Sequence, residues 1–464
     1  MIPLYSRVVA VDDDEDHLQK IVWGLGKAGF CTLPFFFDDG QLEAPPMEPL
    51  QGVRIVFTDI HLIGGGIGNE KTHAANIVRC LKKIVAPGPY VLIFWSQYPD
   101  EGTRIAELIL ERAADSGLVP PIGFGAIDKN EVFKIPSENG DDHFNAGKLR
   151  ELILEKVRDY KTLAVAASWE ERVSRAAAST NDKIFDLVKT SAKPLDDWES
   201  LLAFLACEAV GQRVAKEEIV SSLDAALLPL LEDQLSLIGN DSTPALDDFQ
   251  RLLDIVSLDK RPQCPDSVAK SHLNASYLIE EFVSGAEAKM WSRGTVTALG
   301  SGFVNSGRYV NVFGHDDEAL IRREFATQDL TAEEKRSVKL HVVELGPECD
   351  HVQSKVSTHR YLLALLVPAT LMETGAFTQK SKKNFSNSTR YNNDSVMNVG
   401  KVMLKNHVSG EWFLLISCRC FMALPAENAI EGRPVFRLRR SLIEEVSHRY
   451  VTYARRPGVI RFHD

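Results

Sequence analysis

The segment VVAVDDDEDHLQKI, residues 8–21, joins an apolar run directly to three consecutive aspartates, Asp12, Asp13 and Asp14. Adjacent carboxylates repel each other, and burying a carboxylate costs free energy. A following helix explains one aspartate, because Asp is favoured at a helix N-cap and near the positive end of the helix dipole. The remaining pair predicts a bound cation such as Mg²⁺, which prefers carboxylate oxygens.

A magnesium site needs a further carboxylate, and Asp59 offers one at the end of the apolar stretch VRIVFTD. Ser96 ends the stretch YVLIFWS, and Lys134 lies in EVFKIP. A hydroxyl and an ammonium group beside a metal can neutralise the oxygens of a phosphoryl group. One carboxylate can then act as the nucleophile and form an acyl phosphate.

Apolar segments that alternate with helical patterns must bring these residues together. Strands are predicted at 7–11, 31–37, 53–60, 90–96 and 131–136, and helices at 17–30, 70–85, 102–117 and 148–163. The helix expected between the second and third strands would fall on the proline-rich segment 41–50. This alternation predicts a doubly wound α/β domain with a parallel five-stranded sheet, whose ligands bind at the carboxyl ends of the strands.

Residues 7–160, with these groups in this order, resemble the receiver domain of bacterial two-component response regulators. The resemblance implies a flavodoxin-like fold, Asp59 as the phosphoacceptor and Mg²⁺ as the cofactor. It makes Ser96 the switch hydroxyl and Lys134 the phosphate-sensing lysine. The metal ligands that it implies are Asp12, Asp13, Asp59 and the backbone carbonyl of His61.

The sequence also departs from the pattern of that family. The usual Lys-Pro pair is replaced by Lys134-Ile135-Pro136, and Lys129 is a rival for the role of the lysine. The family's switch aromatic lies three residues before the lysine, where this chain has Glu131. A degenerate receiver that serves as a non-catalytic interaction scaffold therefore remains an alternative.

The composition of the 464 residues narrows the class of protein. A net charge of −11 argues against general binding to nucleic acid, and the seven irregularly spaced cysteines fit reduced thiols better than a disulfide framework. The most apolar stretch, 361–372, is too short to span a bilayer, and the first residues lack the pattern of a signal peptide. We expect a cytoplasmic protein without a membrane partner.

The remainder of the chain predicts a mainly helical segment with a linker at 161–285 and a β-rich domain with a final helix at 286–464. Within 164–464 there is no Gly-rich phosphate loop, no helix-turn-helix signature and no triad of nucleophile, base and acid, so no enzyme is assigned there. The final helix and its flanks are rich in arginine, which is expected to pair with the chain's own acids. These arginines are Arg433, Arg437, Arg439, Arg440, Arg449, Arg455, Arg456 and Arg461.

A second cluster of potential ligands occurs in LGPECDHVQSK, residues 345–355, where Cys349, Asp350 and His351 are consecutive. This short motif resembles a strand-end motif of small β-barrel domains in bacterial defence and toxin-like proteins. A metal site here would need partners, of which the candidates are His359, His407, Cys418 and Cys420. No CxxC or HxxxH spacing supports zinc, so buried structural cysteines are the preferred interpretation.

The expected function is that of a phosphoacceptor in a two-component phosphorelay, with a histidine kinase as phosphodonor. Its only expected activities are self-phosphorylation and autodephosphorylation. The unusual output region suggests a specialised system. The chain resembles the phosphate-buffering receiver protein of Detocs-type anti-phage defence, which implies a second response regulator as a further partner. A receiver-gated effector or nucleic-acid binder in the C-terminal part is the other alternative, and the oligomeric state is open.

Overall fold

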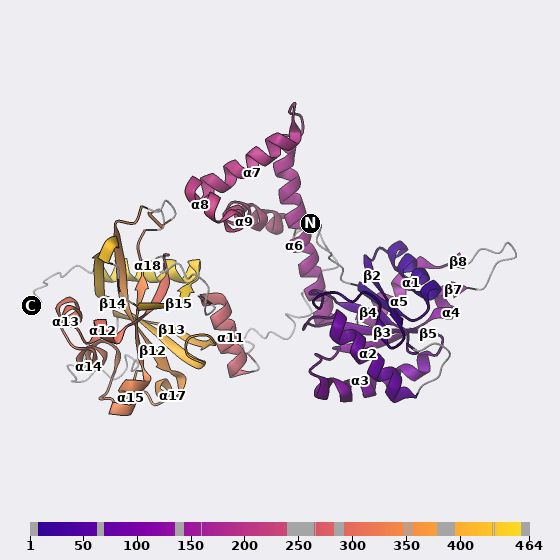
Figure 1. Ribbon diagram of the computed structural model, residues 1–464, viewed down its shortest axis with the longest axis horizontal. Helices are drawn as coiled ribbons and strands as arrows, with labels where there is room; N and C mark the ends of the chain where they lie inside the picture. Colours follow the sequence, from indigo (N-terminus) through magenta and orange to yellow (C-terminus); the bar gives the residue numbers. More distant parts are fainter. Residues whose placement is uncertain are drawn as a thin grey trace, which may run out of the picture. The chain divides into compact units, whose positions relative to one another are not determined.

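The computed structural model describes residues 8–62, 69–134, 143–158, 160–238, 264, 266–282, 292–347, 350–351, 355–377, 395–428, 430 and 432–455. The chain forms two units (Figure 1). The first comprises Met1–Ile184 with Leu230–Arg261, and the second comprises Phe185–Pro229 with Pro262–Asp464.

The first unit contains a six-stranded sheet with the order β3-β2-β1-β4-β5-β6. Five strands are parallel, and β3 pairs antiparallel with β2 at one edge. The mostly parallel sheet is therefore confirmed, with one strand more than predicted. The strands are β1 (Val8–Asp12), β2 (Thr32–Asp38), β3 (Gln41–Leu42), β4 (Ile55–Thr58), β5 (Val91–Ser96) and β6 (Gly123–Asp128).

Helices cover both faces of this sheet (Figure 1). Alternate residues of a strand point to opposite faces, so Val8 belongs to one buried cluster and Val9 to the other. The cluster that contains Val8 includes apolar residues of α1 and α5, and the other includes residues of α2 and α3. These helices are α1 (Glu15–Lys27), α2 (Glu70–Ile84), α3 (Gly102–Ser116) and α5 (Ala146–Arg158).

The fifth parallel strand is β6, so the prediction of a strand at 131–136 is wrong. Lys129–Val132 form the short helix α4, and β7 (Phe133–Lys134) pairs with β8 (His143–Phe144) in a separate two-stranded ribbon. Residues 135 and 136 lie outside the described residues.

The strand β6 escaped prediction because it contains two glycines, which are depleted in strands. The glycines are needed for close packing on the face that α5 covers. A Cβ on Gly125 would lie 3.3 Å from Lys156 Cγ, and one on Gly123 would collide with the Tyr160 ring. The Tyr160 hydroxyl also accepts a hydrogen bond from Phe124 N, at 3.0 Å.

The helix predicted at 41–50 does not form. The segment begins with β3, and Leu50 forms an isolated parallel bridge with Val85. Proline removes a backbone donor and clashes with the preceding helical turn, which accounts for the absence of a helix at this connection.

The middle of the chain is helical, as expected. It contains α6 (Lys161–Asp186), α7 (Pro194–Val210), α8 (Gln212–Glu217), α9 (Ile219–Ile238) and, beyond a gap in the described residues, α11 (Ser267–Leu278). No helix within the described residues combines the length and the apolar character needed to cross a membrane.

The second unit contains a seven-stranded antiparallel sheet with the order β13-β14-β12-β11-β10-β15-β9. Its two faces carry separate apolar clusters, and α18 (Arg440–Ala454) packs Leu442, Ile443 and Val446 into one of them. The predicted β-rich region with a final helix is confirmed. The strands are β9 (Ile279–Glu281), β10 (Thr295–Leu299), β11 (Lys339–Glu344), β12 (Thr358–Pro368), β13 (Val396–Leu404), β14 (Gly410–Pro425) and β15 (Gly432–Leu438).

Not every apolar segment of this β-rich region is a strand. YVNVF, residues 309–313, lies in the helix α13 (Gly307–Phe313). The Ser306 side chain caps this helix by accepting from Tyr309 N, and Gly314 ends it in a left-handed conformation. The other short elements are η2 (Pro99–Glu101), α12 (Ser301–Val304), α14 (Asp317–Leu320), η3 (Ile321–Phe325), α15 (Ala332–Ser337), α17 (Ala369–Glu373) and η6 (Ala426–Asn428).

Candidate metal centre

The three aspartates lie where the strand order of the first sheet reverses. From β1 the chain moves outward to β2, then returns past β1 to β4 and continues to β5 and β6. Ligands of doubly wound sheets bind in the crevice at the carboxyl ends of such strands. Asp12 is the last residue of β1, and Asp59 directly follows β4, with its backbone N–H donating to Val11 O at 3.1 Å.

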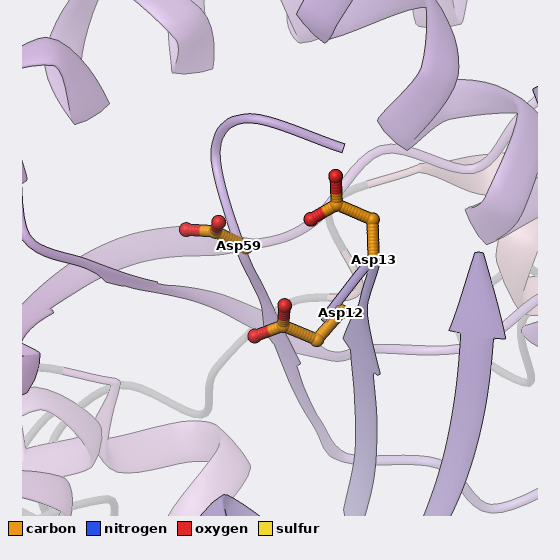
Figure 2. A group of neighbouring side chains, drawn as sticks. All are labelled: Asp12, Asp13 and Asp59. Carbon is orange, nitrogen blue, oxygen red and sulfur yellow. The ribbon is translucent and has the colours of Figure 1, made fainter. Parts of the chain in front are cut away.

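Asp12, Asp13 and Asp59 each offer a carboxylate oxygen, and these oxygens all lie within 4.8 Å of one another (Figure 2). Asp12 is almost completely buried, with 1% of its surface exposed, whereas Asp13 and Asp59 are half-buried. The predicted convergence of residues from two separate segments is thus present in the structure.

The electrostatic cost of this arrangement is visible in the pKa values. Burial, followed by repulsion from Asp12 and then Asp59, raises the pKa of Asp13 to about 6. Burial also raises the pKa of Asp12, although Lys129 opposes the shift. A divalent cation would relieve both the repulsion and the loss of hydration.

Asp14 is the aspartate that caps the helix, a role that the helix pattern predicted for one of the three. Its side chain accepts a hydrogen bond from His17 N at 3.0 Å and caps α1. That bond lowers the pKa of Asp14, whereas the pKa values of Asp12 and Asp13 are raised. The three consecutive aspartates therefore divide into one helix cap and one pair that faces the crevice.

The lysine in the crevice is Lys129, which follows directly after β6. Its Nζ lies 3.2 Å from Asp12 Oδ2 and 3.6 Å from Asp59 Oδ1. Only 6% of the surface of Lys129 is exposed. Because water is largely excluded, the two carboxylates compensate the charge of the ammonium group. The rival lysine of the sequence is the one that the structure places beside the aspartates.

Lys134, which the sequence interpretation preferred, lies in the ribbon strand β7 and not in the parallel sheet. The preference for Lys134 depended on the segment chosen as the fifth strand, and that strand assignment is wrong. When β6 is the fifth strand, the lysine that follows the strand end is Lys129.

Ser96 is the last residue of β5 and is buried. Its hydroxyl accepts a hydrogen bond from Tyr98 N at 3.2 Å, across the turn that follows the strand. The hydroxyl is therefore at the carboxyl edge of the same sheet as the aspartates, as predicted.

His61 lies two residues after Asp59, and its ring contacts three other side chains. Its Nε2 lies 2.9 Å from Glu101 Oε2, and its ring packs edge-on against His73 and Tyr98. Sequence reasoning considered only the backbone carbonyl of His61 and missed this side-chain cluster. The role of that carbonyl as a metal ligand stays a prediction.

The donor set fits Mg²⁺ in its chemistry. Hard carboxylate oxygens are the ligands that Mg²⁺ prefers, usually with several waters. When ionised, the three carboxylates exceed the single ammonium group of Lys129 by two negative charges. Asp12, Asp13 and Asp59 would hold the ion, and Lys129 would remain free of the metal because an ammonium group has no lone pair.

Outside this centre, the arginine-rich end of the chain forms local pairs. Arg437 Nη2 lies 2.7 Å from Glu280 Oε2 on the neighbouring strand β9, and Arg449 donates to Val396 O at 3.3 Å. Arg456 and Arg461 lie outside the described residues, as does Cys349. Cys418 is buried on β14, and burial raises the pKa of its thiol.

Comparison with known proteins adds no family to these observations. No protein-family model, no curated protein and no solved structure matches the chain.

Proposed function

We propose that the first unit is a receiver-type phosphoacceptor domain, in which Asp59 takes a phosphoryl group from a histidine kinase in the presence of Mg²⁺. The observation that carries the proposal is the convergence of three carboxylates with the buried Lys129 at the switch point of a parallel sheet. The order of the five parallel strands, β2-β1-β4-β5-β6, is that of flavodoxin-like folds and supports it.

The residues have distinct roles in this chemistry. An oxygen of Asp59 attacks the phosphorus, the bond between phosphorus and the kinase imidazole breaks, and its electron pair leaves with the imidazole. Asp12 and Asp13, together with Asp59, would hold the metal, which when bound would neutralise charge on the phosphoryl group. Lys129 and the Ser96 hydroxyl are placed to stabilise the same oxygens, because both groups lie at the carboxyl edge of the sheet.

The first experiment is treatment of the full chain with acetyl phosphate, with Mg²⁺ or with a chelator. We expect the mass to increase by one phosphoryl group only when Mg²⁺ is present, and hydroxylamine to release it, as it does for acyl phosphates. Asp59→Asn should abolish the uptake. Asp16→Asn, at an exposed position in the first turn of α1, is the matched control and should react normally.

Equal labelling of the Asp59→Asn variant and the parent chain would refute Asp59 as the acceptor. Absence of any labelling, with acetyl phosphate or with phosphorylated kinases, would favour the alternative of a non-catalytic scaffold. In both cases circular dichroism must show that the parent chain is folded and that the Asp59→Asn variant has the same spectrum.

The sequence of β6 favours a phosphate sink, which is a receiver that accepts phosphate without transmitting a signal. The position three residues before Lys129 is Ala126, so the family's switch aromatic is absent whichever lysine is considered. A methyl group cannot fill the space that a ring would vacate, and the relay from Ser96 to the far face is therefore lost. A domain of this kind would drain phosphate in a bacterial defence pathway of the Detocs type more readily than it would transmit a signal.

A further inference from the structure

The helix α7 of the second unit is rich in apolar residues, yet none of its 17 residues is buried. A helix of a globular protein normally buries an apolar stripe against a neighbouring element. On α7, in contrast, Leu195 is 72% exposed and Phe204 is 58% exposed. Apolar side chains that gather on an exposed surface indicate a site of interaction with another molecule.

Apolar residues of α7 follow a heptad pattern, in which intervals of three and four residues alternate. They are Leu195, Trp198, Leu202, Leu205 and Ala209, which together are called the α7 seam. This spacing places all five residues on one face of the helix, in the positions that contact a partner helix in a coiled coil. The seam is about 21 Å long, so it matches a partner helix of about four turns.

The second unit covers the α7 seam only in part. Trp198 packs edge-on against Phe185 at the end of α6, with the ring centroids 5.4 Å apart. Trp198, Leu202 and Leu205 are half-buried, whereas Leu195 and Ala209 are exposed. The seam therefore retains apolar surface that a further helix can cover.

The charges beside the α7 seam are all negative. Glu199 and Glu208 occupy the two kinds of heptad position that flank the seam, where coiled coils place the charges that select a partner. Both glutamates are exposed, and neither forms an ion pair with another described residue. The helix itself contains no lysine or arginine. A partner helix with basic residues at its own flanking positions would therefore complement this face.

We propose that the α7 seam is a docking site for an amphipathic helix of another protein, whose apolar stripe is flanked by lysine or arginine. Recognition of this kind combines apolar anchors on one face of the bound helix with complementary charges at the edge of the contact. The site lies in the second unit and does not depend on the phosphoryl chemistry proposed for the first.

The charges on α7 disfavour two other occupants of the seam. A second copy of this chain would bring acids and no base to the positions that face Glu199 and Glu208. An anionic membrane surface is disfavoured as well, because helices that bind such surfaces carry lysine and arginine on their polar face.

The test uses a fluorescent peptide of three heptads, with leucine at the seam positions and lysine at the flanking positions. The lysines also prevent the peptide from pairing with itself. One control peptide has glutamate in place of lysine, and the other has the same composition in scrambled order. Fluorescence anisotropy with the full chain should show saturable binding of the lysine peptide, at least about tenfold tighter than that of either control. Binding should weaken as salt is added, because exposed charges are screened.

Leu202→Gln removes an apolar contact from the α7 seam and keeps a residue with good helix propensity. We expect it to weaken binding of the lysine peptide at least about tenfold. Phe204→Gln is the matched control, because Phe204 is exposed on α7 but lies outside the seam. Glu199→Gln combined with Glu208→Gln should weaken binding and reduce its dependence on salt. Asp197→Asn, which removes a charge of the same helix away from the flanking positions, should leave binding unchanged.

The proposal is overturned if the lysine peptide binds no better than the control peptides, or if Leu202→Gln and Phe204→Gln weaken binding equally. It is also overturned if light scattering shows a dimer that Leu202→Gln converts to a monomer, because a second copy then covers the seam. Circular dichroism of each variant separates loss of the site from loss of the fold. If Leu202→Gln fails to fold, the three peptides and the glutamate variants still decide the outcome.

Discussion

Lys129 Nζ lies 3.2 Å from Asp12 Oδ2, and this buried pair joins the end of β6 to the end of β1 across two intervening strands. Removing one partner of a buried ion pair leaves an uncompensated charge. The ammonium group therefore compensates the charge of Asp12 and Asp59. Under the proposed function it would also contact a phosphoryl group on Asp59.

Lys129→Met removes the charge and keeps most of the side-chain volume. We expect the rate of phosphoryl uptake from acetyl phosphate to fall at least about tenfold, or about 1.4 kcal/mol of transition-state stabilisation. The control is Lys134→Met, which should react like the parent because Lys134 lies outside the parallel sheet. The opposite pattern, with only Lys134→Met impaired, would restore the original assignment of the lysine.

Asp13→Ala tests the metal centre directly. Loss of one of three converging carboxylates should weaken Mg²⁺ binding at least about tenfold, which corresponds to about 1.4 kcal/mol. Isothermal titration calorimetry on the full chain measures the change, and Asp16→Ala serves as the control. Equal affinities in the Asp13→Ala variant and the parent would show that this carboxylate is not a ligand.

The raised pKa of Asp13, about 6, predicts how stability changes with pH in the absence of metal. The folded state binds the proton more tightly than the unfolded state, so the stabilising contribution is complete below about 4 and is lost as pH rises through 6. Mg²⁺ binds the deprotonated form and should therefore raise Tm more at pH 7.5 than at pH 5. Asp13→Asn should flatten both dependences, and a Tm increase that is independent of pH would contradict this account.

Gly123→Ala tests why β6 contains glycine. The added methyl group would meet the Tyr160 ring, so we expect a loss of about 1–3 kcal/mol in the free energy of unfolding. Tyr160→Ala in the same chain should make the substitution less harmful, because the clash is removed. Gly147→Ala, at an exposed site in α5, should be neutral or slightly stabilising. Equal effects at the two glycines would contradict the packing argument.

Hydrogen exchange tests whether phosphorylation is transmitted through the first unit. Under the proposed function, Ala126 occupies the position where receiver domains carry an aromatic residue. Phosphorylation should therefore slow exchange near Asp59 and Ser96 and leave the outer face of α3 and β6 unchanged. In cells that carry the proposed phosphorelay, Asp59→Asn should leave more phosphate for a competing receiver. The pathway should then be activated by a weaker stimulus than in cells with the parent chain. Silencing of the pathway by this variant would rule out a phosphate sink.

Local sequence patterns were sufficient for much of the first unit. The acidic pair, Asp59 and Ser96 could be placed at strand ends because continuous apolar runs mark buried parallel strands, and the carboxyl ends of such strands share one edge. The helix cap at Asp14 and the final helix α18 were equally readable, since both depend on neighbours within a few residues.

The tertiary structure decided which lysine faces the aspartates and which segments become strands. The sequence of β6 has weak strand character, and only its packing against Lys156 and Tyr160 makes the two glycines favourable. In the second unit, the pairing of β11 with β12 brings Glu344 to His359, fifteen positions away in the sequence, a contact that no local pattern indicates. Local propensity is set by neighbouring residues, whereas these contacts depend on strand register and burial that only the folded chain supplies.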